Sequence, residues 1–167
     1  LLVNRGRGIT TTRLKASIDL AYPYIARELC ASLPANTDAA LDSMQKLGLV
    51  RRDDEVILPA AQHSEQRLPL LLLSKLVNET LERMYIVLSL AHHGRHTRES
   101  LCQRSQVAAQ QMARLHGINA PEFFDQGLFD QFVDALLANQ HLQTDTDETL
   151  ITNATIAETL HLSLIHI

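Results

Sequence analysis

Apolar residues recur every third or fourth position through most of the chain, the spacing that places side chains on one face of a helix. The strongest pattern covers residues 68–92, with Pro69 in its first turn and Gly94 just beyond its end. Its apolar positions are Leu73, Leu76, Val77, Leu81, Met84, Val87, Leu88 and Ala91. We therefore expect a long helix with a nearly continuous apolar face in this stretch.

Two further helices are predicted before this one. Residues 10–12 offer caps for a helix in which Pro23 should cause a kink or a break near Tyr22, because proline lacks the backbone N–H. The apolar positions of this helix include Leu14, Ile18, Ile25 and Leu29. Asn36 then caps a second helix, and Gly48 suits the left-handed position just past its end. The apolar face of this second helix is Leu41, Met44 and Leu47.

Two more helices are predicted in the second half of the chain. Thr97 caps the first and Gly117 ends it. The residues expected to face inward are Leu101, Ala108, Met112 and Leu115. Asn119 and Glu122 stand in capping-box register for the second helix, with Pro121 in its first turn. Its apolar residues fall every fourth position and should lie along one face: Phe124, Leu128, Phe132 and Leu136.

Short apolar pairs around acidic turns predict two hairpins. Residues 49–58 (LVRRDDEVIL) and the turn at 144–148 (TDTDE) each follow a helix, so the two segments share the layout of a winged helix. The predicted fold is mainly α with small β-hairpins, as two winged-helix-like units joined by a long helical pair. The expected organisation is a partial linker over 1–8, a helix-helix-hairpin unit over 9–60, the helical pair over 61–117, a second helix-hairpin unit over 118–161, and a sequencing-adapter remnant over 162–167 (LSLIHI).

Composition places the chain among folded proteins. Hydrophobic residues are 46% and charged residues 20%, which argues against disorder of the whole chain. Its net charge of −4 argues against a surface wrapped in nucleic acid. The two cysteines, Cys30 and Cys102, lie in no motif, so we expect reduced thiols in a cytosolic compartment. Four charges interrupt the apolar stretch at 68–91, so no membrane span is predicted, and the absence of Met at position 1 suggests a longer parent protein.

A metal site is not favoured. His92 and His96 have a helical i, i+4 offset and His93 lies beside them, but Gly94 ends the helix and no Cys or carboxylate completes a ligand set except Glu99. A polar loop between helices is the favoured interpretation. The pair Asp145-x-Asp147 is similar to the start of a calcium loop, but its sixth position is Leu150 where such a loop needs glycine. A solvated turn is favoured there.

No catalytic constellation is apparent. His116 suits the end of a helix, where it complements the backbone dipole, and Ser105 and Asp125 cannot be assembled with it into a triad. Both cysteines are expected to act as small hydrophobes, and there is no glycine-rich phosphate loop. Arg5, Arg7, Arg13 and Lys15 form a basic cluster that could contact anionic lipid or another domain, although a solvated linker is favoured.

The most distinctive stretch is residues 114–125 (RLHGINAPEFFD). It resembles the C-terminal region of the bacterial membrane-associated glycerol-3-phosphate 1-O-acyltransferase family. Residues 20–23 (LAYP) and 44–50 (MQKLGLV) are similar to that family in the same order and at similar spacing. The resemblance covers residues 9 to 155 or thereabouts and is most specific at residues 117–125.

The resemblance implies a parent enzyme that transfers a fatty acyl group from acyl-CoA or acyl carrier protein to the sn-1 hydroxyl of glycerol 3-phosphate. This would be the first step of phospholipid biosynthesis, at the cytoplasmic face of the inner membrane. The family's chemistry resides in a more N-terminal domain, where a His is followed five positions later by an Asp. None of the eight histidines here has that partner. We therefore expect no catalytic, substrate-binding or metal residue and no cofactor in this chain.

Two roles remain for a region without catalytic residues. The apolar faces over residues 68–91 and 123–137 fit a region that braces the catalytic domain of the same chain. The alternative is a winged-helix module that binds nucleic acid or regulates, with residues 37–47 as its recognition element. That segment carries Asp38 and Asp42 but only one basic residue, Lys46, whereas recognition helices present Arg, Lys, Asn or Gln to DNA. Bracing is therefore the favoured role.

Overall fold

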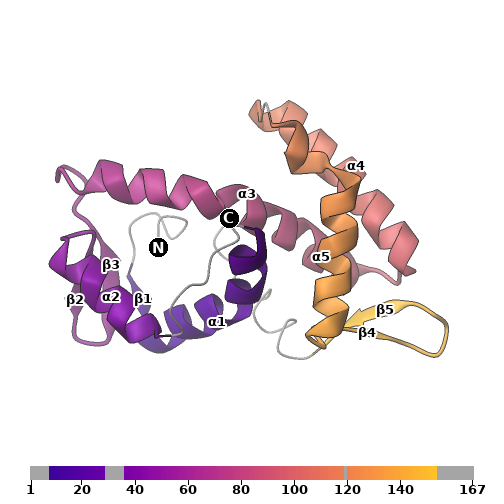
Figure 1. Ribbon diagram of the computed structural model, residues 1–167, viewed down its shortest axis with the longest axis horizontal. Helices are drawn as coiled ribbons and strands as arrows, with labels where there is room; N and C mark the ends of the chain where they lie inside the picture. The colour runs from indigo at the N-terminus through magenta and orange to yellow at the C-terminus, as the bar shows by residue number, and fades with distance from the viewer. Residues whose placement is uncertain (1–7, 29–35, 119, 154–167) are drawn as a thin grey trace. The chain divides into compact units, whose positions relative to one another are not determined.

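The computed structural model describes residues 8–28, 36–118 and 120–153. As predicted, this part of the chain is mainly helical with small antiparallel strand pairs (Figure 1). The chain divides into two compact units, the first extending to Asn78 and the second beginning at Glu79. The long helix α3 (Arg67–His93) contributes to both units. The finer division predicted at residues 60 and 117 stays a prediction.

The first unit places a three-stranded sheet beside two helices. Its elements in order are β1 (Ile9–Thr10), α1 (Thr11–Glu28), α2 (Thr37–Lys46), β2 (Val50–Asp53) and β3 (Val56–Pro59). The sheet order is β1-β3-β2, and both pairs are antiparallel. Ile57 on the central strand pairs with Ile9 on one side and Arg52 on the other, and its side chain is fully buried. The hairpin predicted over residues 49–58 is thereby confirmed.

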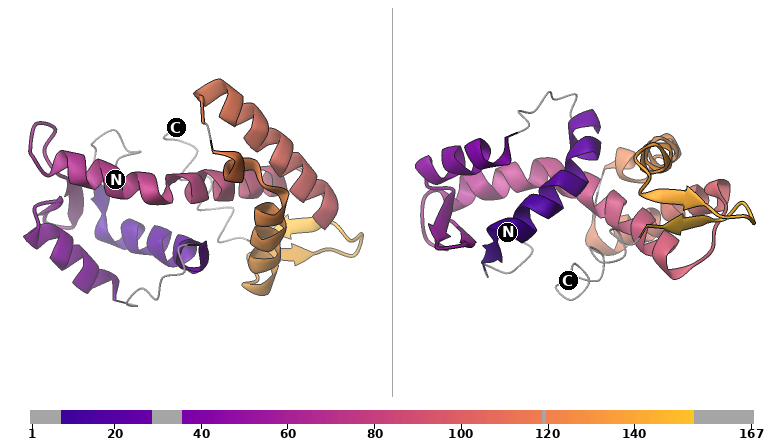
Figure 2. Two further views of the ribbon diagram at one scale, coloured as in Figure 1. Left: turned by 45° about the horizontal axis from the view of Figure 1, so that its top comes forward. Right: turned by 90° about the horizontal axis from the view of Figure 1, so that it is seen from below.

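Helix α1 continues through Pro23 instead of ending at Tyr22. Its ribbon bends part-way along (Figure 2), as expected where proline removes one backbone hydrogen bond and crowds the preceding turn. Ala21 and Tyr24 are the buried side chains near the bend. Leu29, the last apolar position predicted for this helix, lies outside the described residues.

The predicted boundaries of α2 are confirmed by its caps. The Asn36 side chain accepts hydrogen bonds from the backbone N–H groups of Asp38 (3.1 Å) and Ala39 (3.2 Å). Gly48 has φ of 71°, the left-handed conformation that glycine adopts without steric cost. Leu41 is buried, but Leu47 is 66% exposed, so the prediction that Leu47 faces inward is wrong. Leu47 is the C-cap residue, and the chain has already left the helix there.

Helix α3 is buried over only part of its length. In the first unit Leu70 is buried with Leu49 and Ala60, and Met44 packs against this cluster. In the second unit the buried residues of α3 include Met84, Ile86, Val87, Leu88 and Ala91. The predicted apolar face is not buried along its whole length, because Leu73 and Leu76 in the first half and Leu81 are exposed.

The second unit repeats the order of helix, helix and hairpin. Its elements after α3 are α4 (Arg98–His116), the 3-10 turn η1 (Pro121–Phe124), α5 (Gln126–Ala138), β4 (Leu142–Thr144) and β5 (Leu150–Thr152). Strands β4 and β5 pair antiparallel. Before α4, the backbone oxygen of His96 accepts a hydrogen bond from Leu150 N (2.7 Å), just as β1 before α1 pairs with β3. The likeness of these units to winged helices stays a prediction.

Helix α4 has the predicted ends but a different inward face. The Thr97 hydroxyl accepts a hydrogen bond from Ser100 N (3.3 Å), and Gly117 has φ of 65°. The buried residues are mostly small: Leu101, Cys102, Ser105, Ala109 and Ala113. Leu115, predicted to face inward, is 81% exposed, and Ala108 and Met112 are only half-buried. Small side chains allow close helix packing, and apart from Leu101 the residues that α4 presents to the interior are small.

The last helix begins later than predicted. Asp125, not Asn119, is its N-cap, and the Asp125 carboxylate accepts a hydrogen bond from Leu128 N (3.1 Å). Residues 121–124 form the separate turn η1 instead of the first helical turn. The buried side chains of this region are Phe123, Phe129, Val133, Ala135 and Leu136. Of the predicted face, Phe124, Leu128 and Phe132 are half-buried and Leu136 is fully buried.

Arg98 joins the start of α4 to α5. Its Nε donates to one oxygen of the Asp134 carboxylate (2.7 Å) and its Nη2 to the other (2.9 Å), with Asp130 3.6 Å from Nη1. Bidentate pairing of this kind fixes geometry as well as charge. Gln106 adds a second link, because its side-chain amide donates to the backbone oxygen of Phe124 (3.2 Å).

We expect Phe129→Ala to lower the free energy of unfolding by about 3–4 kcal/mol, because the buried ring would leave a cavity between α4 and α5. Leu115→Ala is the matched control on α4 and should cost less than about 0.5 kcal/mol. Urea unfolding followed by circular dichroism measures both. Equal unfolding midpoints for the two variants would contradict the packing described here.

Candidate interaction surface

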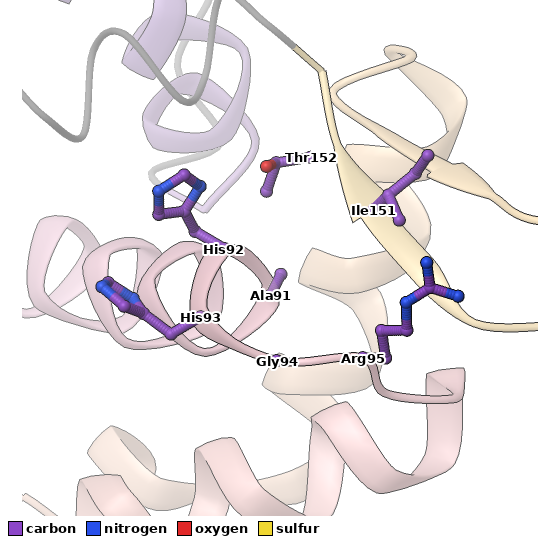
Figure 3. A pocket seen from close by; sticks show the side chains of 7 residues that line it. All are labelled: Ala91, His92, His93, Gly94, Arg95, Ile151 and Thr152. Atoms are coloured by element: carbon purple, nitrogen blue, oxygen red, sulfur yellow. The ribbon is translucent and has the colours of Figure 1, made fainter.

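The three clustered histidines occupy different environments. His92 and His93 are exposed at the end of α3, whereas His96 is 8% exposed. His93 Nδ1 lies 2.8 Å from the backbone oxygen of Ser89 and serves as the donor. A cavity of about 420 Å³ lies here, lined by Ala91, His92, His93, Gly94, Arg95, Ile151 and Thr152. Figure 3 shows the His92 and His93 rings pointing away from Arg95, so the basic groups do not converge.

The described residues contain no group of three or more His, Cys, Asp or Glu side chains placed to hold a metal ion. The carboxylate of Asp145 interacts with groups of the protein. It accepts a hydrogen bond from Thr146 N (2.8 Å), and Arg95 lies 3.6 Å from Asp145 and 3.7 Å from Asp147. Leu150, at the sixth position, is buried in β5.

Burial lowers the pKa of two histidines. The pKa of His96 is lowered from its ordinary value, first by burial and second by the charge of Arg104. The pKa of His141 is lowered by burial. An imidazole that is less easily protonated in the folded state than in the unfolded chain makes stability depend on pH.

The remaining candidates for chemistry have structural environments. Burial raises the pKa of the Cys102 thiol to about 12, and the Asp130 carboxylate reinforces the effect, so the reactive thiolate is not formed near neutral pH. Ser105 is fully buried in α4, Asp125 caps α5, and His116 is exposed in the last turn of α4. These three residues form no triad.

The basic cluster predicted near the start is partly neutralised. Lys15 Nζ lies 2.7 Å from the Asp38 carboxylate, which joins α1 to α2. Arg13 belongs to α1, and Arg5 and Arg7, like Cys30 and residues 162–167, lie outside the described residues.

The distinctive segment at residues 114–125 is a junction between helices. It carries the chain from the end of α4 through η1 to the cap of α5, and it anchors Phe123 in the core with no exposed surface. Beside it lies a shallow cavity of about 310 Å³ lined by Gln110, Ala113, Arg114, Ile118, Ala120, Pro121 and Phe124. The segment therefore sets the path between α4 and α5.

The largest group of exposed apolar side chains lies on the first half of α3. We call it the α3 leucine face and define it as Leu68, Leu71, Leu72 and Leu76, which are 61%, 42%, 55% and 66% exposed. Their spacing of i, i+3, i+4 and i+8 places them on one side of the helix. Leu70, on the other side, is 5% exposed. The sequence predicted an apolar face here that fits a bracing role, but periodicity does not show which of its side chains the fold leaves exposed.

A contiguous set of exposed leucines differs from the single exposed apolar residues common on protein surfaces. Such patches mark places where another molecule or another part of the chain packs. No helix in the described ranges has a stretch both long and apolar enough to span a membrane. The α3 leucine face is therefore the candidate functional site of this region.

Comparison with known proteins identifies relatives over most of the chain. The family model described as glycerol-3-phosphate acyltransferase C-terminal region matches residues 1–145. Glycerol-3-phosphate acyltransferase of Pseudomonas entomophila is 35% identical over 145 residues, covering 82% of this chain and 18% of that protein. The protein of the same name from Pseudomonas aeruginosa UCBPP-PA14 is 36% identical over 132 residues, covering 74% of this chain and 16% of the relative.

A third relative, the glycerol-3-phosphate acyltransferase of Alteromonas mediterranea, is 31% identical over 150 residues, covering 86% of this chain and 18% of the relative. The chain thus spans less than a fifth of the length of these proteins. No solved structure matches it.

We expect stability to fall as the pH drops below about 6.5, because His96 and His141 take up a proton more readily in the unfolded chain than in the fold. Each such histidine contributes a slope of up to about 1.4 kcal/mol per pH unit between its two pKa values. Urea unfolding at pH 7.5 and 5.5 measures the loss. His96→Gln should reduce it, whereas His116→Gln at the exposed end of α4 should leave it intact; the reverse result would contradict the assignment.

We expect the double variant Leu72→Gln/Leu76→Gln, in the chain produced alone, to bind less of a hydrophobic dye and to self-associate less, because it interrupts the α3 leucine face. Dye fluorescence and sedimentation measure the change, with Leu115→Gln as the control outside the face. The melting temperature of the double variant should stay within a few degrees of the parent. A large fall would place these leucines in the core instead.

Proposed function

The chain belongs to the glycerol-3-phosphate acyltransferase C-terminal region family, and from that membership we propose that it is the non-catalytic C-terminal part of such an enzyme. The parent enzyme transfers an acyl group from acyl-CoA or acyl carrier protein to the sn-1 hydroxyl of glycerol 3-phosphate. On this proposal it acts as a peripheral protein at the cytoplasmic face of the bacterial inner membrane.

The observation that carries the proposal is the partial overlap with relatives. The match covers most of this chain but only 16–18% of each relative, so most of each relative lies outside it. Acyl transfer to a hydroxyl needs a base positioned to take its proton. The environments of His96, Cys102 and Ser105 support the view that this base lies elsewhere in the parent protein, because each of these side chains is buried within the unit.

We propose further that the region braces the catalytic part of the same chain. Two features support bracing over a binding pocket for substrate. The basic side chains that line the cavity at His92, His93 and Arg95 do not converge (Figure 3), and the cores of the units contain fully buried side chains such as Ile57 and Phe129. The first half of α3, by contrast, offers an apolar surface suited to packing against a large partner.

A nucleic-acid-binding role is less well supported by the charges on α2. Asp38 is paired with Lys15, and Asp42 lies 2.9 Å from Arg52. The carboxylates of α2 thus form ion pairs with two neighbouring basic side chains. Phosphate contacts require free cations on the docking helix. A salt-dependent shift of duplex DNA by the chain would favour this alternative.

A chimera tests the proposed function. In the Pseudomonas entomophila acyltransferase, the segment matched by this chain is replaced with residues 1–145, and the chimera is compared with the intact enzyme and with a version that lacks the segment. We expect the truncated enzyme to lose most of its activity and abundance, and the chimera to recover both several-fold, because a missing brace destabilises the catalytic part. Acylation of labelled glycerol 3-phosphate by membranes measures activity.

Two outcomes would contradict the proposal. A truncated enzyme as active and abundant as the intact one would mean that the region has no bracing role. A chimera that accumulates normally but is inactive would mean that this chain does not replace the relative's segment. Growth of a host whose own acyltransferase is repressed provides an independent measurement of the same recovery.

A further inference from the structure

The α3 leucine face, made of Leu68, Leu71, Leu72 and Leu76, has apolar side chains that the described residues leave largely exposed. We propose that this face is the surface on which the region docks to the remainder of its own acyltransferase polypeptide. The inference rests on the proposed function and adds to it the element and side chains that make the contact.

The helix is apolar on more sides than its own unit covers. Leu70 and, more weakly, Val77 face the unit, while the four leucines of the face lie on the other side. A helix that is apolar nearly all round is normally buried on all sides. Residues 68–74 contain no charged residue, so the sequence of this stretch is not that of a surface exposed to water.

The charges around the face are few. Lys75 and Glu79 follow Leu68 at i+7 and i+11, so both lie on the same side of the helix as the face, toward its C-terminal end, and carry opposite charges. Arg67, at the start of α3, directs its Nη1 to the backbone oxygen of Ala60 (3.3 Å). Helices that lie on anionic membranes flank their apolar side with several Lys and Arg, whereas residues 67–79 contain only Arg67 and Lys75 against Glu79. So few basic residues favour a protein partner over a lipid surface.

The length of the relatives indicates which protein is the partner of the face. The matched segment is 16–18% of each relative, so more than four-fifths of the polypeptide lies outside it and is covalently joined to it. A tethered partner acts at an effective concentration on the order of millimolar. Permanent interfaces of this kind are as apolar as a domain core. The rest of the same chain therefore reaches the face ahead of a free protein or a second copy.

The test uses the active chimera described above, with substitutions inside residues 1–145. Leu72→Gln/Leu76→Gln should lower activity and resistance to heat inactivation by about tenfold or more, the size expected when two central residues of an apolar interface are replaced. Leu72→Met/Leu76→Met preserves the apolar character and should retain activity. Leu115→Gln, on an exposed leucine of α4, is the matched control and should have no effect.

A photo-crosslinking amino acid identifies the occupant directly, even if the glutamine variant fails to accumulate. Placed at position 72 of the chimera in native membranes, it should link to a peptide upstream of the matched segment within the same polypeptide, as found by mass spectrometry. Placed at position 115 it should not. A link from position 72 to a second copy or to lipid, or no link at all, would overturn the inference.

Failure of this inference is distinguishable from failure of the proposed function. If the unsubstituted chimera is inactive, the proposed function fails before the face is tested. If the chimera is active, but the glutamine variant is equally active and position 72 does not link to the catalytic part, the docking assignment alone is wrong.

Discussion

Burying the apolar side chains of a helix stabilises a fold, and α3 carries more of them than the described residues cover. In its second half, Met84, Val87 and Leu88 are buried and form part of the core of the second unit. In its first half the hairpin cluster of Leu49 and Ala60 covers only Leu70. Helix α3 contributes residues to both units, and the leucines of its first half stay exposed.

In the second unit, helix α4 packs through small buried residues. Helix α4 buries Cys102, Ser105, Ala109 and Ala113, which leaves room for the aromatic rings of Phe123 and Phe129. The Arg98 fork on Asp134 then fixes how α5 lies along α4. The hydrogen bonds that Arg98 donates to the Asp134 carboxylate are the main reason that the pKa of Arg98 is raised, so the guanidinium stays charged throughout the physiological range.

Local signals in the sequence predicted local structure well. The caps at Asn36 and Thr97 and the left-handed glycines at Gly48 and Gly117 involve hydrogen bonds within a few residues, so their patterns are readable in one sequence. The start of α5 was missed because two caps competed. Asp125 follows a proline-led 3-10 turn and takes the position that the Asn119–Glu122 register suggested.

Burial was harder to predict, because it depends on residues distant in sequence. Leu115 and the α3 leucine face have the periodicity of core positions, yet they are exposed, whereas the small buried residues of α4 give almost no hydrophobic signal. Periodicity therefore indicated the apolar face over residues 68–91, but not which of its side chains stay exposed. The α3 leucine face becomes apparent only when the apolar pattern of the sequence is compared with the side chains that the fold buries.

The environment of Cys102 has a consequence for experiments on motion. Its thiol is 1% exposed at the contact of α4 with α5, and its pKa of about 12 leaves almost no thiolate in the closed state. Alkylation at this position therefore requires the two helices to separate first. The labelling rate of Cys102, resolved from that of Cys30 by peptide mapping, reports how often the second unit opens locally, without any probe having to be introduced.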